Sequence, residues 1–158
     1  ELLQTLSSTE GIDYIEHIII NGGECEKTRD YLKDKRLRSV SEKDYGIYDA
    51  FNKGISLSKE KYIIFLNSGD TLIDRNYWLD AIAGLEKNPL LSFTHSDIIF
   101  EDSIAGELYF KPHGKNIGRG MPYFHQTLIV RRAVFERIGL FNLDFSIALK
   151  SSFRNDIR

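Results

Sequence analysis

The chain of 158 residues contains one cysteine, Cys25, which excludes an internal disulfide and a cysteine-rich zinc site. It also lacks long hydrophobic runs: stretches such as residues 62–66 have the length of a strand, far below the roughly 20 residues of a membrane helix. Neither charge dominates, because 21 basic residues face 23 acidic ones, giving a net charge of −2. We therefore expect no nucleic acid partner, and the lone cysteine favours a cytoplasmic location.

Several signature loops are missing as well. The sequence has no GxxxxGK[ST] phosphate loop, no GxGxxG dinucleotide loop and no GxSxG nucleophile turn. Its four histidines are widely spaced, so a histidine zinc site would need assembly from distant segments. What remains is a composition of 42% hydrophobic and 28% charged residues, ordinary for a single globular domain.

Apolar patterning predicts alternating strands and helices. Alternation of this kind is typical of an α/β fold with a mostly parallel sheet and crossover helices, followed here by antiparallel pieces around residues 103–106. The expected strands are residues 14–20, 37–40, 62–66, 92–100, 107–110 and 128–131, and the expected helices are residues 1–8, 25–34, 46–57, 75–87 and 133–138.

Ligands of such sheets bind beyond the carboxyl ends of the strands, so polar turns that follow apolar strands are the first places to search. One such turn is Asn67-Ser68-Gly69-Asp70, in the sequence FLNSGD. The carboxylate of Asp70 is suited to hold a divalent cation that also binds a diphosphate. Alternatively, Asp70 closes the turn or caps the next helix.

The segment SEKDYGIYDAFNKG, residues 41–54, provides a helix with one apolar and one polar face. Its polar side chains are suited to contact a base, a ribose or a phosphate. They are equally compatible with a solvated surface that carries an Asp49–Lys53 pair at i,i+4 spacing.

A third polar group stands in RGMPYFHQTLIV, residues 119–130. His125 and Gln126 precede a strand and are suited to bind an acceptor sugar or a phosphate. A structural histidine whose hydrogen bonds go to the backbone fits the pattern as well.

Four segments in this order resemble bacterial family 2 glycosyltransferases of the GT-A fold, most of all enzymes that build capsular, colanic-acid-like or other exopolysaccharides. They are EHIIINGG (residues 16–23), SEKDYGIYDAFNKGI (41–55), YIIFLNSGD (62–70) and GMPYFHQTLIVRRAVFERIGLFN (120–142). The second of these matches the family's segment nearly residue for residue. The resemblance implies one GT-A domain over residues 1–158, with a nucleotide-sugar-binding half (1–100), an acceptor-side half (101–148) and an unmatched tail (149–158).

The resemblance also implies roles for single residues. Asp70 matches the carboxylate that holds Mn2+ or Mg2+, and His125 with Gln126 matches the acceptor side. For the catalytic base, Asp97 and Asp144 are weak candidates, Asp156 a weaker one, and the base itself is expected outside the chain. The residues implied beside the nucleotide are Asn21, Asp44, Tyr48, Asp49, Asn52, Asn67 and Ser68.

The implied reaction moves a sugar, with inversion, from a nucleoside diphosphate, with UDP the expected carrier, to a glycan or lipid-linked acceptor. This places the enzyme in the cytoplasm, at the inner face of the membrane when the acceptor is lipid-linked, and peripheral membrane association and homo-oligomers are compatible with it. Two alternatives stay open: a nucleotide-sugar-binding module without turnover, and a sugar nucleotidyltransferase.

The sequence departs from the family at several points. Asn21 stands where the family has an aspartate, and Asp70 is the only carboxylate of its motif. The family's opening apolar strand and its base-bearing segment find no match, so we expect a chain that is incomplete at its front and cut or spliced near residues 148–149. Loss of the opening strand is expected to leave backbone groups of neighbouring strands unpaired.

Overall fold

We describe the protein from a computed structural model, which describes residues 15–23, 25–32, 38–74, 76–112 and 122–144. The chain divides into two compact units. The first unit comprises residues 1–16 and 59–138, and the second comprises residues 17–58 and 139–158. In the described part of the chain, no helix has the length and apolar character needed to cross a membrane.

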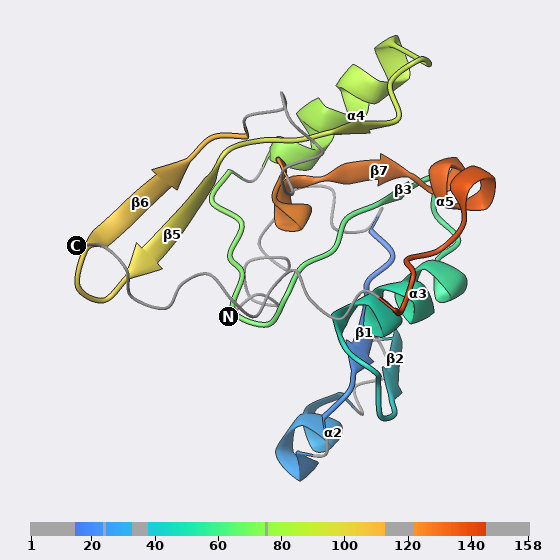
Figure 1. Ribbon diagram of the computed structural model, residues 1–158, viewed down its shortest axis with the longest axis vertical. Coiled ribbons are helices and arrows are strands. Elements are labelled where there is room, and N and C mark those ends of the chain that lie inside the picture. Colours follow the sequence, from blue (N-terminus) through green and yellow to red (C-terminus); the bar gives the residue numbers. More distant parts are fainter. Residues whose placement is uncertain (1–14, 24, 33–37, 75, 113–121, 145–158) are drawn as a thin grey trace. The chain divides into compact units, whose positions relative to one another are not determined.

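The second unit is built on a parallel pair of strands. β1 (Ile18–Asn21) pairs with β2 (Arg38–Ser41) in a register that places Asn21 opposite Ser41. In the sequence α2 (Glu26–Leu32) stands between the two strands, and α3 (Ile47–Leu57) follows β2 and packs beside β1 (Figure 1). The buried face of α3 carries Phe51 and Ile55, which lie one turn apart as an amphipathic helix requires.

A glycine and a serine mark the two ends of α3. Gly46 precedes the helix with a φ of 113°, a backbone conformation that side chains other than glycine's rarely allow. At the other end, the backbone N–H of Ser58 donates to the carbonyls of Gly54 and Ile55. The polar face of α3 therefore begins directly after the loop that contains Asp44.

The first unit contains a three-stranded antiparallel sheet. Its order is β3 (Tyr62–Ile63), β7 (Ile129–Arg131) and β4 (Phe93–Thr94), with β7 in the centre. The helix α4 (Tyr77–Lys87) contacts β4 and β7. The hydrophobic core lies where α4 meets β7; its buried members are Trp78, Ala81, Leu85 and Ile129.

Four further elements of this unit lie in the described residues. β5 (Ile98–Asp102) and β6 (Gly106–Phe110) form an antiparallel hairpin (Figure 1). Asp102 closes the hairpin turn, since its Oδ1 accepts hydrogen bonds from the backbone N–H groups of Ile104 and Ala105. The 3-10 turn η3 (His125–Thr127) precedes β7, and α5 (Arg132–Ile138) follows it.

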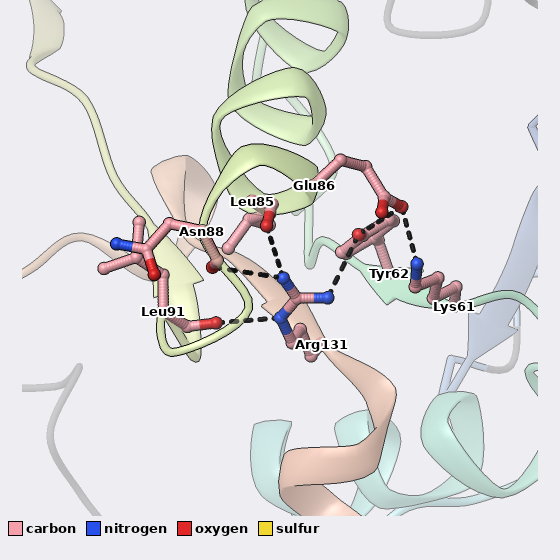
Figure 2. A network of polar contacts seen from close by, with 7 residues as sticks. All are labelled: Lys61, Tyr62, Leu85, Glu86, Asn88, Leu91 and Arg131. Carbon is pink, nitrogen blue, oxygen red and sulfur yellow. Dashed lines mark hydrogen bonds and ion pairs between the residues drawn. The ribbon is translucent and has the colours of Figure 1, made fainter.

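Arg131, at the end of β7, connects the sheet to the end of α4 (Figure 2). Its guanidinium donates hydrogen bonds to the carbonyl oxygens of Leu85, Asn88 and Leu91 and to the Tyr62 hydroxyl. Carbonyls at the end of a helix have no partner within the helix, so a side-chain donor there stabilises it. Lys61 and Glu86 form an exposed ion pair next to this network, with 2.6 Å between Nζ and Oε1.

The observed elements confirm the α/β alternation, and several differ in extent from the expected ones. The expected strand over residues 14–20 is found at Ile18–Asn21. The expected strand over residues 62–66 pairs only at Tyr62–Ile63. The expected strand over residues 92–100 consists of two strands, β4 and β5, separated by residues 95–97. The expected helices over residues 46–57 and 75–87 begin at Ile47 and Tyr77, since Gly46 and Asn76 occupy the cap positions. The expected helix over residues 1–8 lies outside the described residues.

Candidate functional site

The end of β1 is a polar turn organised by Asn21. The amide Nδ2 of Asn21 donates to the hydroxyl of Ser41 on β2 and to the carbonyl of Gly23, and its Oδ1 accepts from the N–H of Gly23. A carboxylate has no donor, so it would lose the bond to the Gly23 carbonyl and would keep the Ser41 contact only by accepting from the hydroxyl. This chain's asparagine is therefore suited to join the carboxyl ends of the two parallel strands.

Asp44 lies against the backbone of the same turn. A Cβ atom added to Gly22 would lie 1.8 Å from Oδ2 of Asp44 and 2.5 Å from its Cγ, so only glycine leaves room for this carboxylate. The other oxygen, Oδ1, accepts a hydrogen bond of 3.1 Å from the N–H of Gly46. The half-buried carboxylate is thus placed by the loop itself at the carboxyl ends of β1 and β2.

Asp49 and Lys53 on α3 form an ion pair of 3.1 Å that also fixes the loop before the helix. Lys53 pairs with Glu42 at 3.0 Å and donates to the carbonyl of Lys43, while Oδ2 of Asp49 accepts from the N–H of Tyr45. The Tyr45 N–H and the Lys53 ammonium lower the pKa of Asp49, and the Glu42 and Asp49 carboxylates raise the pKa of Lys53. Both groups are therefore charged at neutral pH and engaged with the loop.

Asn52 and Tyr48, the other polar residues of α3 expected beside the nucleotide, contact Phe141 in the same unit. The Asn52 carboxamide forms two hydrogen bonds of 2.9 Å with the backbone of Phe141, donating to its carbonyl and accepting from its N–H. The Tyr48 ring stacks on the Phe141 ring, with centroids 5.3 Å apart and an interplanar angle of 9°. The structure thus gives these two residues protein partners.

In the first unit, Asn67-Ser68-Gly69-Asp70 forms a tight turn after β3. The Asp70 N–H donates to the Asn67 carbonyl, and Gly69 has a φ of 98°, as the third position of a type II turn requires. Oδ2 of Asp70 accepts from the Asn67 N–H at 2.6 Å, so the carboxylate does close the turn. Ser68 is exposed at its tip.

His125 meets this turn, although 58 residues separate it from Asn67. Nδ2 of Asn67 lies 3.0 Å from Nε2 of His125, which is buried with 8% exposure. Burial lowers the pKa of His125, and the negative charge of Asp70 offsets part of this effect. The ring is consequently neutral at pH 7, and Gln126 beside it is half-buried. The structure therefore places the expected acceptor-side histidine in contact with the expected donor-side turn.

Asp70 offers a single carboxylate as a ligand for a divalent cation. Within the described residues, no three His, Cys, Asp or Glu side chains gather as a metal-binding group. Asp70 is half-buried, and its only hydrogen bond from the described chain goes to Oδ2, which leaves Oδ1 as an oxygen ligand. A single carboxylate fits Mg2+ or Mn2+ when phosphate oxygens and water complete the shell.

The weak candidates for the catalytic base lie in exposed positions. The Asp97 side chain is 57% exposed, and its Oδ2 lies 3.9 Å from Nζ of Lys111. Asp144 is exposed and its N–H donates to Oδ1 of Asn142. Asp156 lies outside the described residues.

Sequence reasoning missed Gly22 and Phe141 as parts of these arrangements. A glycine after a strand indicates a turn in the sequence, but no sequence pattern indicates that Asp44 approaches Gly22. Phe141 follows a helix and a glycine, where an aromatic residue is ordinarily taken for core packing. Only the tertiary contacts identify both.

Comparison with known proteins gives the chain its family. The model of the family described as "Glycosyl transferase family 2" matches residues 1–139. A "PGL/p-HBAD biosynthesis glycosyltransferase" of Mycobacterium bovis is 27% identical, over 84% of this chain and 54% of the relative. An uncharacterized glycosyltransferase of Mycobacterium tuberculosis is 29% identical, over 96% of this chain and 62% of the relative.

The chain thus spans less than two thirds of the length of these relatives. The family model nevertheless covers most of its residues, including both polar turns and all of α3. This confirms the family that the four sequence segments indicate, whereas their likeness to capsular and colanic-acid enzymes stays a prediction. The protein belongs to glycosyl transferase family 2 and has that family's α/β fold of the GT-A type.

Proposed function

We propose that the protein transfers a sugar from a nucleoside diphosphate sugar, with UDP as the carrier, to a glycan or lipid-linked acceptor in the synthesis of a cell-surface polysaccharide. The observation that carries this proposal is the carboxylate of Asp44 on the backbone of Gly22. Family membership supports sugar transfer as the reaction class. The geometry supports a nucleotide as the ligand of the second unit.

Asp44 lies where its carboxylate would accept hydrogen bonds from the donor groups of a nucleoside. Asn21 and Ser41 end two parallel strands, and ligands of α/β sheets bind beyond such ends. A carboxylate only accepts hydrogen bonds, so its natural partners on a nucleotide are ribose hydroxyls and the ring N–H of uracil. Because Gly46 fixes one oxygen of Asp44, the carboxylate is oriented before a ligand arrives.

The metal is assigned to the turn that contains Asp70, as the resemblance to the family implies. Asp70 would hold Mn2+ or Mg2+, and the bound cation would offset the negative charge that develops on the departing diphosphate. Ser68 at the exposed tip offers a hydroxyl donor to a phosphate or ribose oxygen. The buried, neutral His125 adds no positive charge here and orients the Asn67 amide.

Transfer with inversion requires the acceptor hydroxyl to attack the sugar from the side opposite the diphosphate and to lose its proton to a base. Among the described residues, Asp97 and Asp144 are carboxylates exposed enough to meet an acceptor. We assign His125 and Gln126 to the acceptor side of the proposed site. An acceptor on a lipid carrier would bring the enzyme to the inner face of the membrane.

Calorimetry tests the donor site directly. UDP binding is measured with and without Mn2+ for the wild type, Asp44→Ala and Asp70→Ala, with Asp80→Ala as a control on the exposed surface of α4. We expect binding that weakens about tenfold in Asp44→Ala, as loss of a charged hydrogen bond predicts. We also expect Mn2+ to strengthen binding in the wild type and the control but not in Asp70→Ala.

The alternatives give different results. Binding of UDP without release of UDP from any UDP-sugar would indicate a binding module without turnover. Release of pyrophosphate from UTP in the presence of a sugar phosphate would indicate a nucleotidyltransferase. No binding of UDP, GDP or TDP to the wild type would refute the proposed donor site.

A further inference from the structure

The short segment that follows α5 is fixed to α3 through one residue, Phe141. We call residues 139–144 the post-helix segment; it belongs to the second unit, as α3 does. Asn52 of α3 forms two hydrogen bonds of 2.9 Å with the Phe141 backbone, across 89 residues of sequence. Both bonds are partly buried, so water competes less for these groups than at an open surface.

The carboxamide of Asn52 matches the peptide group of Phe141 in both directions. Its Nδ2 donates to the carbonyl and its Oδ1 accepts the N–H, an arrangement that needs a donor and an acceptor on one planar group. Aspartate keeps only the acceptor, and alanine keeps neither. The planar pairing leaves Asn52 little freedom to turn toward a ligand.

The Phe141 side chain lies against two aromatic rings of the same helix. It stacks on Tyr48 and lies 5.7 Å from the Phe51 ring at 57°. Tyr48 and Phe51 are three residues apart and therefore neighbours on the surface of α3. Backbone and side chain of Phe141 are thus both bound by α3.

We propose that Asn52 and Tyr48 are positioning residues that hold the post-helix segment, and with it the carboxylate of Asp144, on the nucleotide-side helix α3. Asp144 lies three residues after Phe141, and its N–H bonds to the Asn142 side chain within the same short turn. Asn52 acts on Asp144 through Phe141 and does not bind the nucleotide. The role of the post-helix segment in sugar transfer rests on the proposed function. The attachment of Phe141 to α3 rests on the observed contacts alone.

Hydrogen exchange at the Phe141 amide tests the attachment without any substrate. The full chain is compared with Asn52→Ala, Asn52→Asp and a control, Ser56→Ala, whose hydroxyl bonds to the Asn52 carbonyl on the same helix. We expect exchange to accelerate about tenfold in Asn52→Ala, because the acceptor of the Phe141 N–H is lost. In Asn52→Asp the acceptor remains, so exchange stays nearer the wild-type rate.

A second pair of variants examines the ring contact. Tyr48→Phe keeps the stacked ring and is expected to leave Phe141 exchange unchanged, whereas Tyr48→Ala accelerates it several-fold. Far-ultraviolet circular dichroism confirms that each variant is folded. Unchanged exchange at Phe141 in both Asn52→Ala and Tyr48→Ala would overturn the inference.

Ligand measurements separate positioning from nucleotide binding. For Asn52→Ala we expect UDP affinity within about twofold of the wild type, while the turnover number for release of UDP from UDP-glucose, UDP-galactose or UDP-N-acetylglucosamine falls about tenfold. A tenfold loss of UDP affinity would make Asn52 a nucleotide ligand and refute the positioning role. A wild type that neither binds UDP nor releases it refutes the proposed function, and Phe141 exchange then decides the attachment by itself.

Discussion

Replacing Gly22 by alanine is expected to displace the Asp44 carboxylate while leaving the fold in place. The new Cβ would lie 1.8 Å from Oδ2 of Asp44, so the carboxylate has to move by about 1.5 Å to reach ordinary contact distance. The atom that must move is the end of a side chain, and rotation about its Cα–Cβ bond is sufficient. Gly22 is not among the glycines with positive φ, so its backbone accepts alanine.

The stability cost follows from the hydrogen bond that the rotation breaks. Asp44 would lose the bond from the Gly46 N–H, an exposed contact worth about 0.5–1.5 kcal/mol. Loss of unfolded-state freedom on changing glycine to alanine offsets this by about 0.4–1 kcal/mol. Gly22→Ala should therefore unfold in urea within about 1 kcal/mol of the wild type, yet bind UDP about as weakly as Asp44→Ala.

A double-mutant cycle makes this reasoning testable. In the Asp44→Ala background the space over residue 22 is free, so adding Gly22→Ala should leave UDP affinity unchanged. It should also stabilise the fold by about 0.4–1 kcal/mol, which comes from lost unfolded-state freedom. Gly23→Ala is the matched control, because its Cβ would meet only Oδ1 of Asn21 at 3.5 Å, an ordinary contact. Additive losses of UDP affinity in the double variant, or full UDP affinity in Gly22→Ala, would show that Asp44 does not occupy this position.

Three further predictions concern stability and are measured by urea unfolding. Gly84→Ala within α4 should stabilise the fold by about 0.5–1 kcal/mol, because the added Cβ meets nothing within 4 Å. Destabilisation would show that the space beside Gly84 is occupied. Arg131→Lys should destabilise by about 2–3 kcal/mol, since an ammonium cannot reproduce the guanidinium's several bonds, and an unchanged midpoint would show the network to be incidental. Burial lowers the pKa of His17 and of His125, so the unfolded chain takes up protons at these histidines before the folded chain does as the pH falls. Their contribution to the free energy of unfolding is therefore fully present above about pH 6.5 and declines below it. The decline should be less steep in His125→Gln.

Local features of the fold were predictable because their signals are local. Gly46 and Ser58 bound α3 within one residue of the expected helix, and Gly69 marks the turn at residues 67–70. The hairpin around residues 103–106 follows from a polar, glycine-containing turn between apolar runs. In each case the residue that sets the backbone lies in the element or directly beside it.

The long-range contacts were not predictable, since their partners leave no matching pattern. Asn52 and Phe141 are 89 residues apart, and Asn67 and His125 are 58 apart. The expected strand over residues 62–66 pairs over two residues only, because pairing depends on a neighbour and not on apolar character alone. Resemblance to a family supplied candidate residues without indicating what each one touches.

The polar face of α3 shows that a segment can match its family closely without every polar side chain contacting a nucleotide. Each polar side chain can be judged by where its hydrogen bonds go. Asp49 and Lys53 bond to the loop before the helix, and Asn52 bonds to Phe141. Asp44 differs, since one of its oxygens is fixed by Gly46 and the other lies over a residue without a side chain.

A carboxylate that is oriented by the protein and bordered by a glycine is a candidate for ligand contact, whereas a side chain with protein partners on its polar atoms is a candidate for holding the scaffold. Asp44 and Asp49 are both aspartates and lie five residues apart, yet we expect their replacement by alanine to change UDP affinity by different amounts. Asp44→Ala should weaken UDP binding about tenfold at little cost in stability. Asp49→Ala should loosen the loop at Tyr45 and weaken UDP binding only through that loop. Restoring an acceptor with Asp49→Asn should therefore recover UDP affinity in part, while Asp44→Asn should not, because the ligand's donors need the full negative charge.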